Sequence, residues 1–138
     1  MPPDNAAILI DHATALMRFK RDVITAKAIL SRVDTDVLVE VAKPYYNVVL
    51  GLISLDERDS YLALKYFQQA LSGITPYMNA NPNAEQFADV VHGYLALAYA
   101  QGGDLQAGRE HFRIAEPRLR IFTLQDLTQR CEKAGLHR

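Results

Sequence analysis

The sequence predicts an all-α domain of about seven helices, and two observations carry this prediction. Apolar residues recur every three or four positions along most of the 138 residues, and residues that favour helices fill these stretches. Residues that begin or end helices separate the stretches, at 20–22, Pro44, 56–60, 75–83, 102–104, Pro117 and Gly135. With 49% hydrophobic and 22% charged residues, the chain has the composition of one globular domain that needs no disulfide.

The clearest pair of helices spans residues 92–117. A first helix runs into the turn Gly102-Gly103-Asp104, where Asp104 is a suitable N-cap for a second, amphipathic helix. Two helices that cross closely need small residues at their contact, and Ala96 and Gly108 have the right positions. Larger side chains fill the space on either side, namely Tyr99 and Phe112.

A similar arrangement recurs earlier in the chain. In residues 47–73, Gly51 takes the place of Ala96, Ala63 the place of Gly108 and Phe67 the place of Phe112. A weaker copy covers residues 10–33. The pattern therefore predicts three helix-turn-helix units, of which the third is the best defined.

The doubled pattern resembles the tetratricopeptide repeat family, whose period is about 34 residues. The resemblance implies an α-solenoid of antiparallel helix pairs in a single domain of residues 1–138, with repeats near 7–33, 44–73 and 82–117. The corresponding positions Thr14, Gly51 and Ala96 lie 37 and 45 residues apart, so the repeats are irregular. Within the longer connection, Asn81 and Pro82 suit the first positions of a helix that reaches Ala100.

A further helix is predicted at residues 123–134. Thr123 and Asp126 have the spacing of a capping box, and Gly135 suits the end of a helix. Leu124, Leu127 and Cys131 share one face of it. Such a helix would cover the apolar face that a last repeat otherwise exposes.

Several classes of function are not expected. The sequence has no phosphate loop, dinucleotide fingerprint, metal-ligand spacing or nucleophile motif, so we predict no enzyme, no cofactor and no metal site. His12, His92, His111 and His137 are expected to have surface or packing roles, and Cys131 is expected to be a buried packing residue. The net charge of −1 argues against nucleic acid as a partner. No membrane span or secretory signal is recognised, so the expected location is the cytoplasm.

Charge is uneven along the chain. Residues 109–138 hold 7 of the 15 Lys and Arg residues but only 4 of the 16 Asp and Glu residues. The basic set includes Arg109, Arg113, Arg118, Arg120, Arg130 and Lys133. It is either a solvated helix face or a surface that tunes the choice of partner. The acidic residues Asp56, Glu57 and Asp59 are expected to cap a helix at a turn, with a cation or partner site as the alternative.

The resemblance also implies which residues line the concave face of the array. The first group is Tyr45, Val48, Leu52, Leu55, Val90 and Leu97, and Ile8 and Asp11 would also face the groove. All six of the first group are apolar or aromatic. Val48, Val49 and Leu52 stand where chaperone-binding members carry the polar carboxylate clamp, so no such clamp is expected.

Three interpretations of this apolar groove remain open. It binds an apolar or amphipathic segment of another protein, it joins two copies of the chain, or the C-terminal helix or the 75–83 insertion fills it. The sequence therefore predicts a protein-interaction module or scaffold. The alternatives are an enzyme or small-molecule binder with a pocket under the 75–83 insertion, where Tyr77 and Met78 would form a lid, and a purely structural homodimer.

Overall fold

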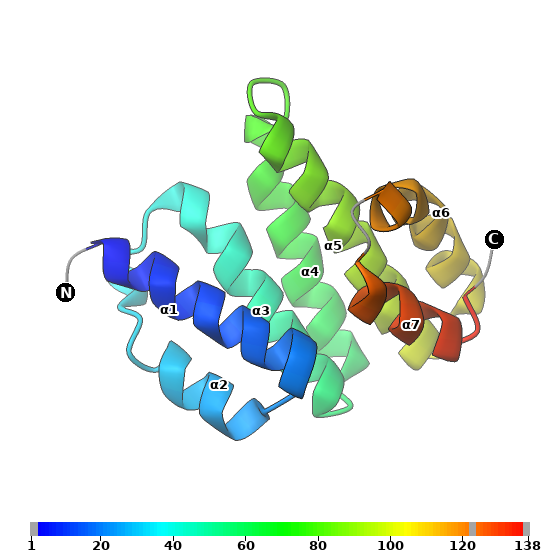
Figure 1. The fold of residues 1–138 in the computed structure, drawn as a ribbon, viewed down its shortest axis with the longest axis horizontal. Helices are drawn as coiled ribbons and strands as arrows, with labels where there is room; N and C mark the ends of the chain where they lie inside the picture. The colour runs from blue at the N-terminus through cyan, green and yellow to red at the C-terminus, as the bar shows by residue number, and fades with distance from the viewer. Residues whose placement is uncertain (1–2, 122–123, 137–138) are drawn as a thin grey trace.

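The computed structural model describes residues 3–121 and 124–136, and within these ranges the chain forms seven α-helices and no strand (Figure 1). The predicted all-α class and number of helices are confirmed. The helices are α1 (Pro3–Ala15), α2 (Val23–Leu30), α3 (Lys43–Asp56), α4 (Ser60–Ile74), α5 (Pro82–Gln101), α6 (Leu105–Ile121) and α7 (Gln125–Lys133). A π-helical turn, η1 (Leu16–Lys20), extends α1, and the 3₁₀ turns are η2 (Thr35–Val37), η3 (Glu40–Ala42) and η4 (Thr75–Tyr77).

Three turns join consecutive helices into the pairs α1–α2, α3–α4 and α5–α6, and they have one design. Each contains a residue with positive φ, in the order Arg21, Arg58 and Gly103. The next residue is an aspartate whose carboxylate accepts a hydrogen bond from a backbone N–H of the following helix: Asp22, Asp59 and Asp104. The cap predicted at Asp104 is thus present, and the acidic residue Asp59 serves as a cap as well.

The crossing of α3 and α4 requires a glycine. A Cβ atom added to Gly51 would lie 2.3 Å from the ring of Phe67, which is completely buried. Ala63, one turn before Phe67 on α4, is also completely buried. The small residues predicted at this crossing therefore do lie in tight packing.

The crossing of α5 and α6 is similar, but the residue that follows α7 also packs against it. A Cβ added to Gly108 would lie 3.1 Å from the backbone oxygen of Ala96 and 3.1 Å from the side chain of Leu136, just beyond α7. Phe112 is buried beside this contact. Tyr99 is only partly buried, and its ring stacks on His111.

The prediction of a helix break at Pro117 is wrong, because α6 continues to Ile121. Proline inside a helix removes one backbone hydrogen bond and costs about 3 kcal/mol. Burial on both sides of Pro117 offsets this cost, since Ala115 and Leu119 both lie in the core. Tertiary packing thus overrides the local preference.

The 75–83 insertion forms the tip between α4 and α5 that projects at the top of Figure 1. Asn81 caps α5 by accepting a hydrogen bond from the Asn83 N–H at 2.9 Å, as predicted. Tyr77 and Met78 pack against a small apolar cluster of Ile74, Ala84 and Ala88. The insertion therefore has its own core.

The C-terminal helix α7 packs against α5 and α6 and contacts η1. Its buried residues are Leu127 and Cys131, followed by Leu136 beyond its end. Gly135 follows the helix with φ of 88°, as expected for a glycine C-cap. Thr123 lies outside the described residues. Among the helices of the described chain, none combines the length and the apolar character required to cross a bilayer.

Candidate functional site

The inner surface formed by α3 and α5 is divided into two halves. The closed half contains Leu52, Leu55 and Leu97, which are 0%, 1% and 6% exposed. The open half contains Tyr45 and Val90, which line a cleft together with Val48, itself only 4% exposed. The six residues predicted for the concave face therefore do not form one continuous accessible surface.

Two segments cover the closed half, with η1 lying on α3 and α7 lying on α5. Gly93 of α5 lies beneath this cover, where the Leu127 side chain of α7 packs closely against it. A Cβ atom there would lie 2.9 Å from the Leu127 side chain, and the Cys131 thiol donates a weak hydrogen bond to the Gly93 carbonyl at 3.9 Å. Segments η1 and α7 of the same chain therefore fill this part of the groove.

An ion pair connects the two covering segments. Arg18 of η1 donates from Nε and Nη2 to the two carboxylate oxygens of Asp126 on α7, each at 2.9 Å. Burial raises the pKa of Asp126, but the hydrogen bonds and the charge of Arg18 lower it by more, so that this pKa lies below its ordinary value of 3.8. A bidentate, partly buried pair of this kind fixes orientation as well as adding stability.

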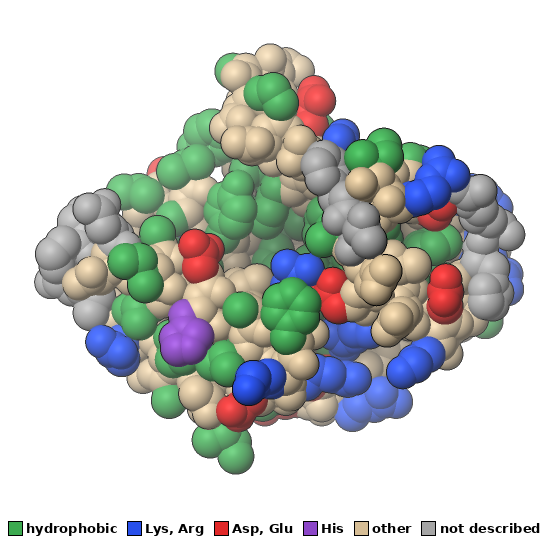
Figure 2. Space-filling model, in the orientation of Figure 1, with side chains coloured by type: hydrophobic (Ala, Val, Ile, Leu, Met, Phe, Trp, Pro, Cys, Tyr) green, Lys and Arg blue, Asp and Glu red, His purple; other side chains and the backbone are tan. Residues whose placement is uncertain are grey.

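The open half forms the front cleft, a cavity of about 430 Å³ between α1, α3 and α5. Its apolar wall consists of Tyr45, Val48, Phe87, Val90 and Tyr94. The rings of Tyr45 and Phe87 lie 4.2 Å apart between centroids. Figure 2 shows this region as a hollow with a hydrophobic floor, below the projecting tip.

Polar side chains stand around the front cleft. Asp11 and Thr14 lie on the α1 side, and Arg18 and Arg118 also line it. Arg118 donates to Asp89 at 3.0 Å, and Arg18 is held by Asp126. Because both arginines already have carboxylate partners, the apolar wall is the main feature that a ligand would meet.

Phe87, Tyr94 and Arg18 were not among the residues predicted for the groove. Phe87 and Tyr94 lie three residues before and four residues after Val90, so helical spacing from Val90 in the predicted helix would have found both of them. Arg18 had no sequence signal, because its position in the site depends on η1 and on the distant Asp126.

A second cavity, of about 350 Å³, lies beside the 75–83 insertion. Tyr77 lines it with Pro44 and Pro76, whereas Met78 does not. Its charged side chains, Glu40 and Lys43, form an ion pair with each other. The predicted pocket exists in outline, but among its described lining residues no titratable groups converge on a reacting position.

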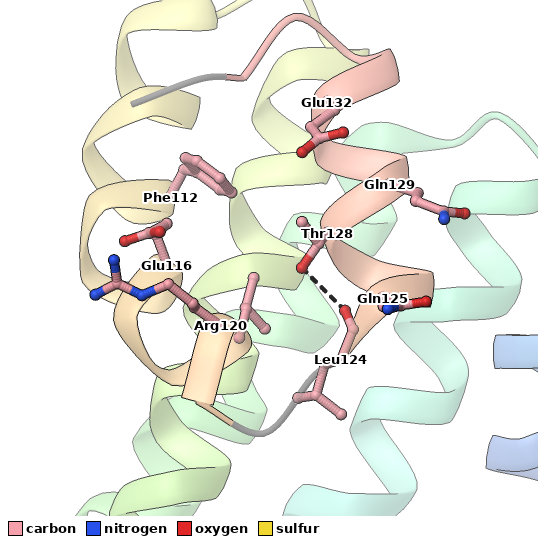
Figure 3. A pocket seen from close by; sticks show the side chains of 9 residues that line it. Phe112, Glu116, Arg120, Leu124, Gln125, Thr128, Gln129 and Glu132 are labelled. Atoms are coloured by element: carbon pink, nitrogen blue, oxygen red, sulfur yellow. Dashed lines mark hydrogen bonds between the residues drawn. The ribbon is translucent and has the colours of Figure 1, made fainter.

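A third cavity, of about 380 Å³, lies between α6 and α7 (Figure 3). Figure 3 shows Glu116 and Arg120 on one wall and Gln125, Thr128 and Glu132 on the other. The Thr128 hydroxyl donates to the Leu124 carbonyl at 3.0 Å. This cavity combines charges of both signs with the apolar side chains of Phe112, Leu119 and Leu124.

His92 and His111 form a half-buried pair between α5 and α6, with their Nδ1 atoms 2.9 Å apart. Burial lowers the pKa of both, and the proximity of His111 lowers that of His92 further. Only one of the two facing Nδ1 atoms can carry the proton of this hydrogen bond, so the accepting histidine must be neutral. Among the described residues, no group of three or more His, Cys, Asp and Glu side chains is arranged to hold a metal ion. His12 is exposed, and His137 lies outside the described residues.

Cys131 is completely buried, and burial raises the pKa of its thiol to about 12. It remains protonated at neutral pH and packs as a small apolar residue, as expected.

The acidic residues predicted to lie at a turn form ion pairs within the chain. Asp56 binds Arg21 and Arg130, and Glu57 binds Lys27. The C-terminal basic set is divided, since Arg118 and Arg130 are paired whereas Arg109 and Arg113 are exposed on α6.

Comparison with known proteins gives no family, no characterised protein and no solved structure that matches this chain.

Proposed function

We propose that this protein is a non-enzymatic protein-interaction module whose front cleft binds an apolar side chain presented by a segment of another protein. The observation that carries the proposal is the open half of the inner surface. There, Tyr45 remains 36% exposed beside Phe87 and Val90. Apolar clefts rimmed by polar groups mark sites for protein or ligand binding.

The rim argues for an apolar anchor rather than a charged one. Arg18 and Arg118 are each neutralised by an aspartate, and Asp11 adds an exposed negative charge. The wall is built from aromatic and aliphatic side chains, and burial of apolar area contributes about 25 cal/mol per Å². A partner helix or extended segment with one large apolar residue fits these features.

The proposal includes an irregular tetratricopeptide-like architecture and a cytoplasmic location. The common turn design of the pairs α1–α2, α3–α4 and α5–α6 supports the first, together with the tight crossings at Gly51 and Gly108. The buried, unpaired thiol of Cys131 is compatible with the second. The groove holds no carboxylate clamp in this proposal, because Val48, Val49 and Leu52 are buried apolar residues.

Site-specific photo-crosslinking tests the proposal. A photoreactive phenylalanine at position 45, in the cleft, is compared with the same group at position 61, where Tyr61 is 81% exposed on α4. We expect the position-45 protein, in cells, to form one discrete adduct with another polypeptide, and the position-61 protein to form none. Adding Val90→Glu to the position-45 protein should abolish the adduct, because a carboxylate in the apolar wall would be desolvated by the partner.

Three other outcomes would contradict the proposal. An adduct with a second copy of the chain, accompanied by dimer mass in light scattering, would favour the homodimer. A small molecule that co-purifies in stoichiometric amount and is lost on Val90→Glu would favour a ligand-binding protein. Equal adducts from positions 45 and 61 would show that the cleft has no special role.

A further inference from the structure

A basic cavity, which we call the terminal pocket, lies at the other end of the closed half. Its volume is about 400 Å³, and the chain segments around it include the turns that follow η1 and α3 and the last turns of α5 and α7. Its charged lining residues are Arg21, Arg58, Arg130 and Lys133. Figure 2 shows Lys and Arg side chains gathered on the lower right of the visible face. None of these four residues belongs to the front cleft.

The positive charge of the terminal pocket is only partly balanced. Asp56 is the carboxylate that pairs with the set, and it is shared by Arg21 at 2.7 Å and Arg130 at 3.2 Å. Arg58 and Lys133 make no ion pair or hydrogen bond with any side chain of the described residues. Burial, followed by the charge of Arg21, lowers the pKa of Arg130, as expected where cations gather.

Helix ends do not remove this surplus. The C-terminal ends of η1, α3, α5 and α7 lie at the pocket, and each carries about half a negative charge. Together with Asp56 they offset roughly three of the four positive charges. A surplus of about one positive charge remains, which favours an anion.

Backbone conformation gives an independent observation. Arg21 and Arg58 have φ of 52° and 64°, in the left-handed region that favours glycine. The equivalent residue of the third turn is Gly103, which does not line the pocket. Arginine therefore occupies the strained position only at the two turns that border the pocket. Strain of this kind, of the order of 1 kcal/mol, is often associated with a functional site.

The remaining lining is uncharged. Leu55, Leu97 and Ala100 form an apolar floor, of which Leu55 and Leu97 are only 1% and 6% exposed. Gln101 also lines the pocket; its Nε2 donates to the Leu55 carbonyl at 3.0 Å, which fixes the amide, while its Oε1 is buried and has no partner. A ligand therefore meets mainly the four cations.

We propose that the terminal pocket binds the phosphate group of a small phosphate monoester. A phosphate monoester carries about −1.5 to −2 charges and three strong acceptor oxygens, which allows several of the four cations to bind it at once. The volume of about 400 Å³ leaves room for a small organic portion beside the phosphate.

The test is a titration of the full chain with glycerol 3-phosphate, inorganic phosphate, sulfate and glycerol, followed by amide shifts in heteronuclear NMR. We expect saturable shifts confined to the turns around Arg21, Arg58 and Gly102 and to the end of α7. Glycerol 3-phosphate should bind at least as tightly as inorganic phosphate and sulfate, and at least about tenfold more tightly than glycerol, which has no phosphate group. A hydrogen bond to a charged phosphate contributes about 1.5–3 kcal/mol to the free energy of binding. A tenfold change in affinity corresponds to about 1.4 kcal/mol.

Matched variants separate the site from general charge. Arg58→Gln and Lys133→Gln remove cations without an internal partner, and each should weaken binding of glycerol 3-phosphate about tenfold with the fold intact by circular dichroism. The controls are Arg113→Gln on α6 and Lys65→Gln on α4, exposed residues that remove the same charge elsewhere. They should change the affinity less than about twofold.

Several results would overturn this proposal. Equal weakening by Arg58→Gln and Arg113→Gln would show that only net charge matters, and displacement of phosphate by equimolar chloride would show an unspecific anion site. A phosphoserine peptide that binds far more tightly than glycerol 3-phosphate would assign the pocket to a protein ligand. A fold disrupted by both Arg58→Gln and Lys133→Gln would show that these residues serve stability instead. Because the front cleft shares none of the four cations, failure here leaves the proposed interaction site untouched, and the reverse also holds.

Discussion

The two halves of the inner surface are similar in composition but differ in what covers them. Around Leu52, Leu55 and Leu97 the chain folds its own segments, η1 and α7, onto the groove. Around Tyr45 and Val90 the same two inner helices, α3 and α5, are left facing a cleft. The difference teaches that an apolar inner helix does not by itself reveal a binding surface, because the same residues serve as core wherever a later segment reaches them.

The position of the boundary follows from where α7 can pack. Gly93 and Gly108 leave space on α5 and α6 for Leu127 and Leu136. The Arg18–Asp126 pair then ties α7 to η1. Beyond this pair, toward the tip of α4 and α5, the groove is open.

Leu127→Ala gives the largest expected effect, because it removes the side chain that packs against Gly93. Truncating a buried leucine costs about 2–5 kcal/mol through lost transfer energy and the cavity that remains. We expect a loss of this size in the free energy of unfolding, measured by urea denaturation. The control is Leu105→Ala at a largely exposed leucine, and a loss below about 1 kcal/mol at position 127 would mean that α7 does not seal the closed half.

The glycines beneath the two halves allow a finer comparison. In Gly51→Ala the new methyl group meets the buried Phe67 ring at 2.3–2.7 Å, and we expect a loss of about 1–3 kcal/mol. In Gly93→Ala the nearest atom is the flexible end of Leu127 at 2.9 Å, and alanine also favours the helix. That variant should remain within about 1 kcal/mol of the parent in the same urea experiment. Equal losses would show that α7 is held as rigidly as α4.

The sequence was sufficient to predict most of the helices, but it predicted only part of the candidate site. Helical spacing and capping residues such as Asp104 and Asn81 located most helices, because these signals act within one or two turns. The break at Pro117 was misplaced because burial of Leu119 outweighs a local preference. The extent of the open half was beyond prediction, since it depends on a contact between Arg18 and Asp126 across 108 residues.

Asp126→Asn tests the pair that marks the boundary. Losing a charged, bidentate hydrogen bond that is partly exposed should cost about 1–2 kcal/mol at pH 7. The pKa of Asp126 in the folded protein is below the ordinary 3.8, so its stabilising contribution is present above that value and is lost as the pH falls through the lowered pKa. Parent and variant should therefore converge in stability in acid. A difference between them that stays constant from pH 7 to pH 3 would show that the charge of Asp126 does not hold α7.

Tyr45→Ala carries the smallest expected effect and completes the comparison. Tyr45 contributes a partly exposed ring whose contact with Phe87 is worth about 0.5–1.5 kcal/mol, so thermal unfolding should shift little. The matched variant Tyr61→Ala removes a ring that has almost no cover. The two should differ in stability by about 1 kcal/mol or less, whereas only Tyr45→Ala should weaken binding of the partner captured at the front cleft. If Tyr45→Ala instead costs as much as Leu127→Ala, then Tyr45 belongs to the core and the open half is as much a part of the folded interior as the closed half.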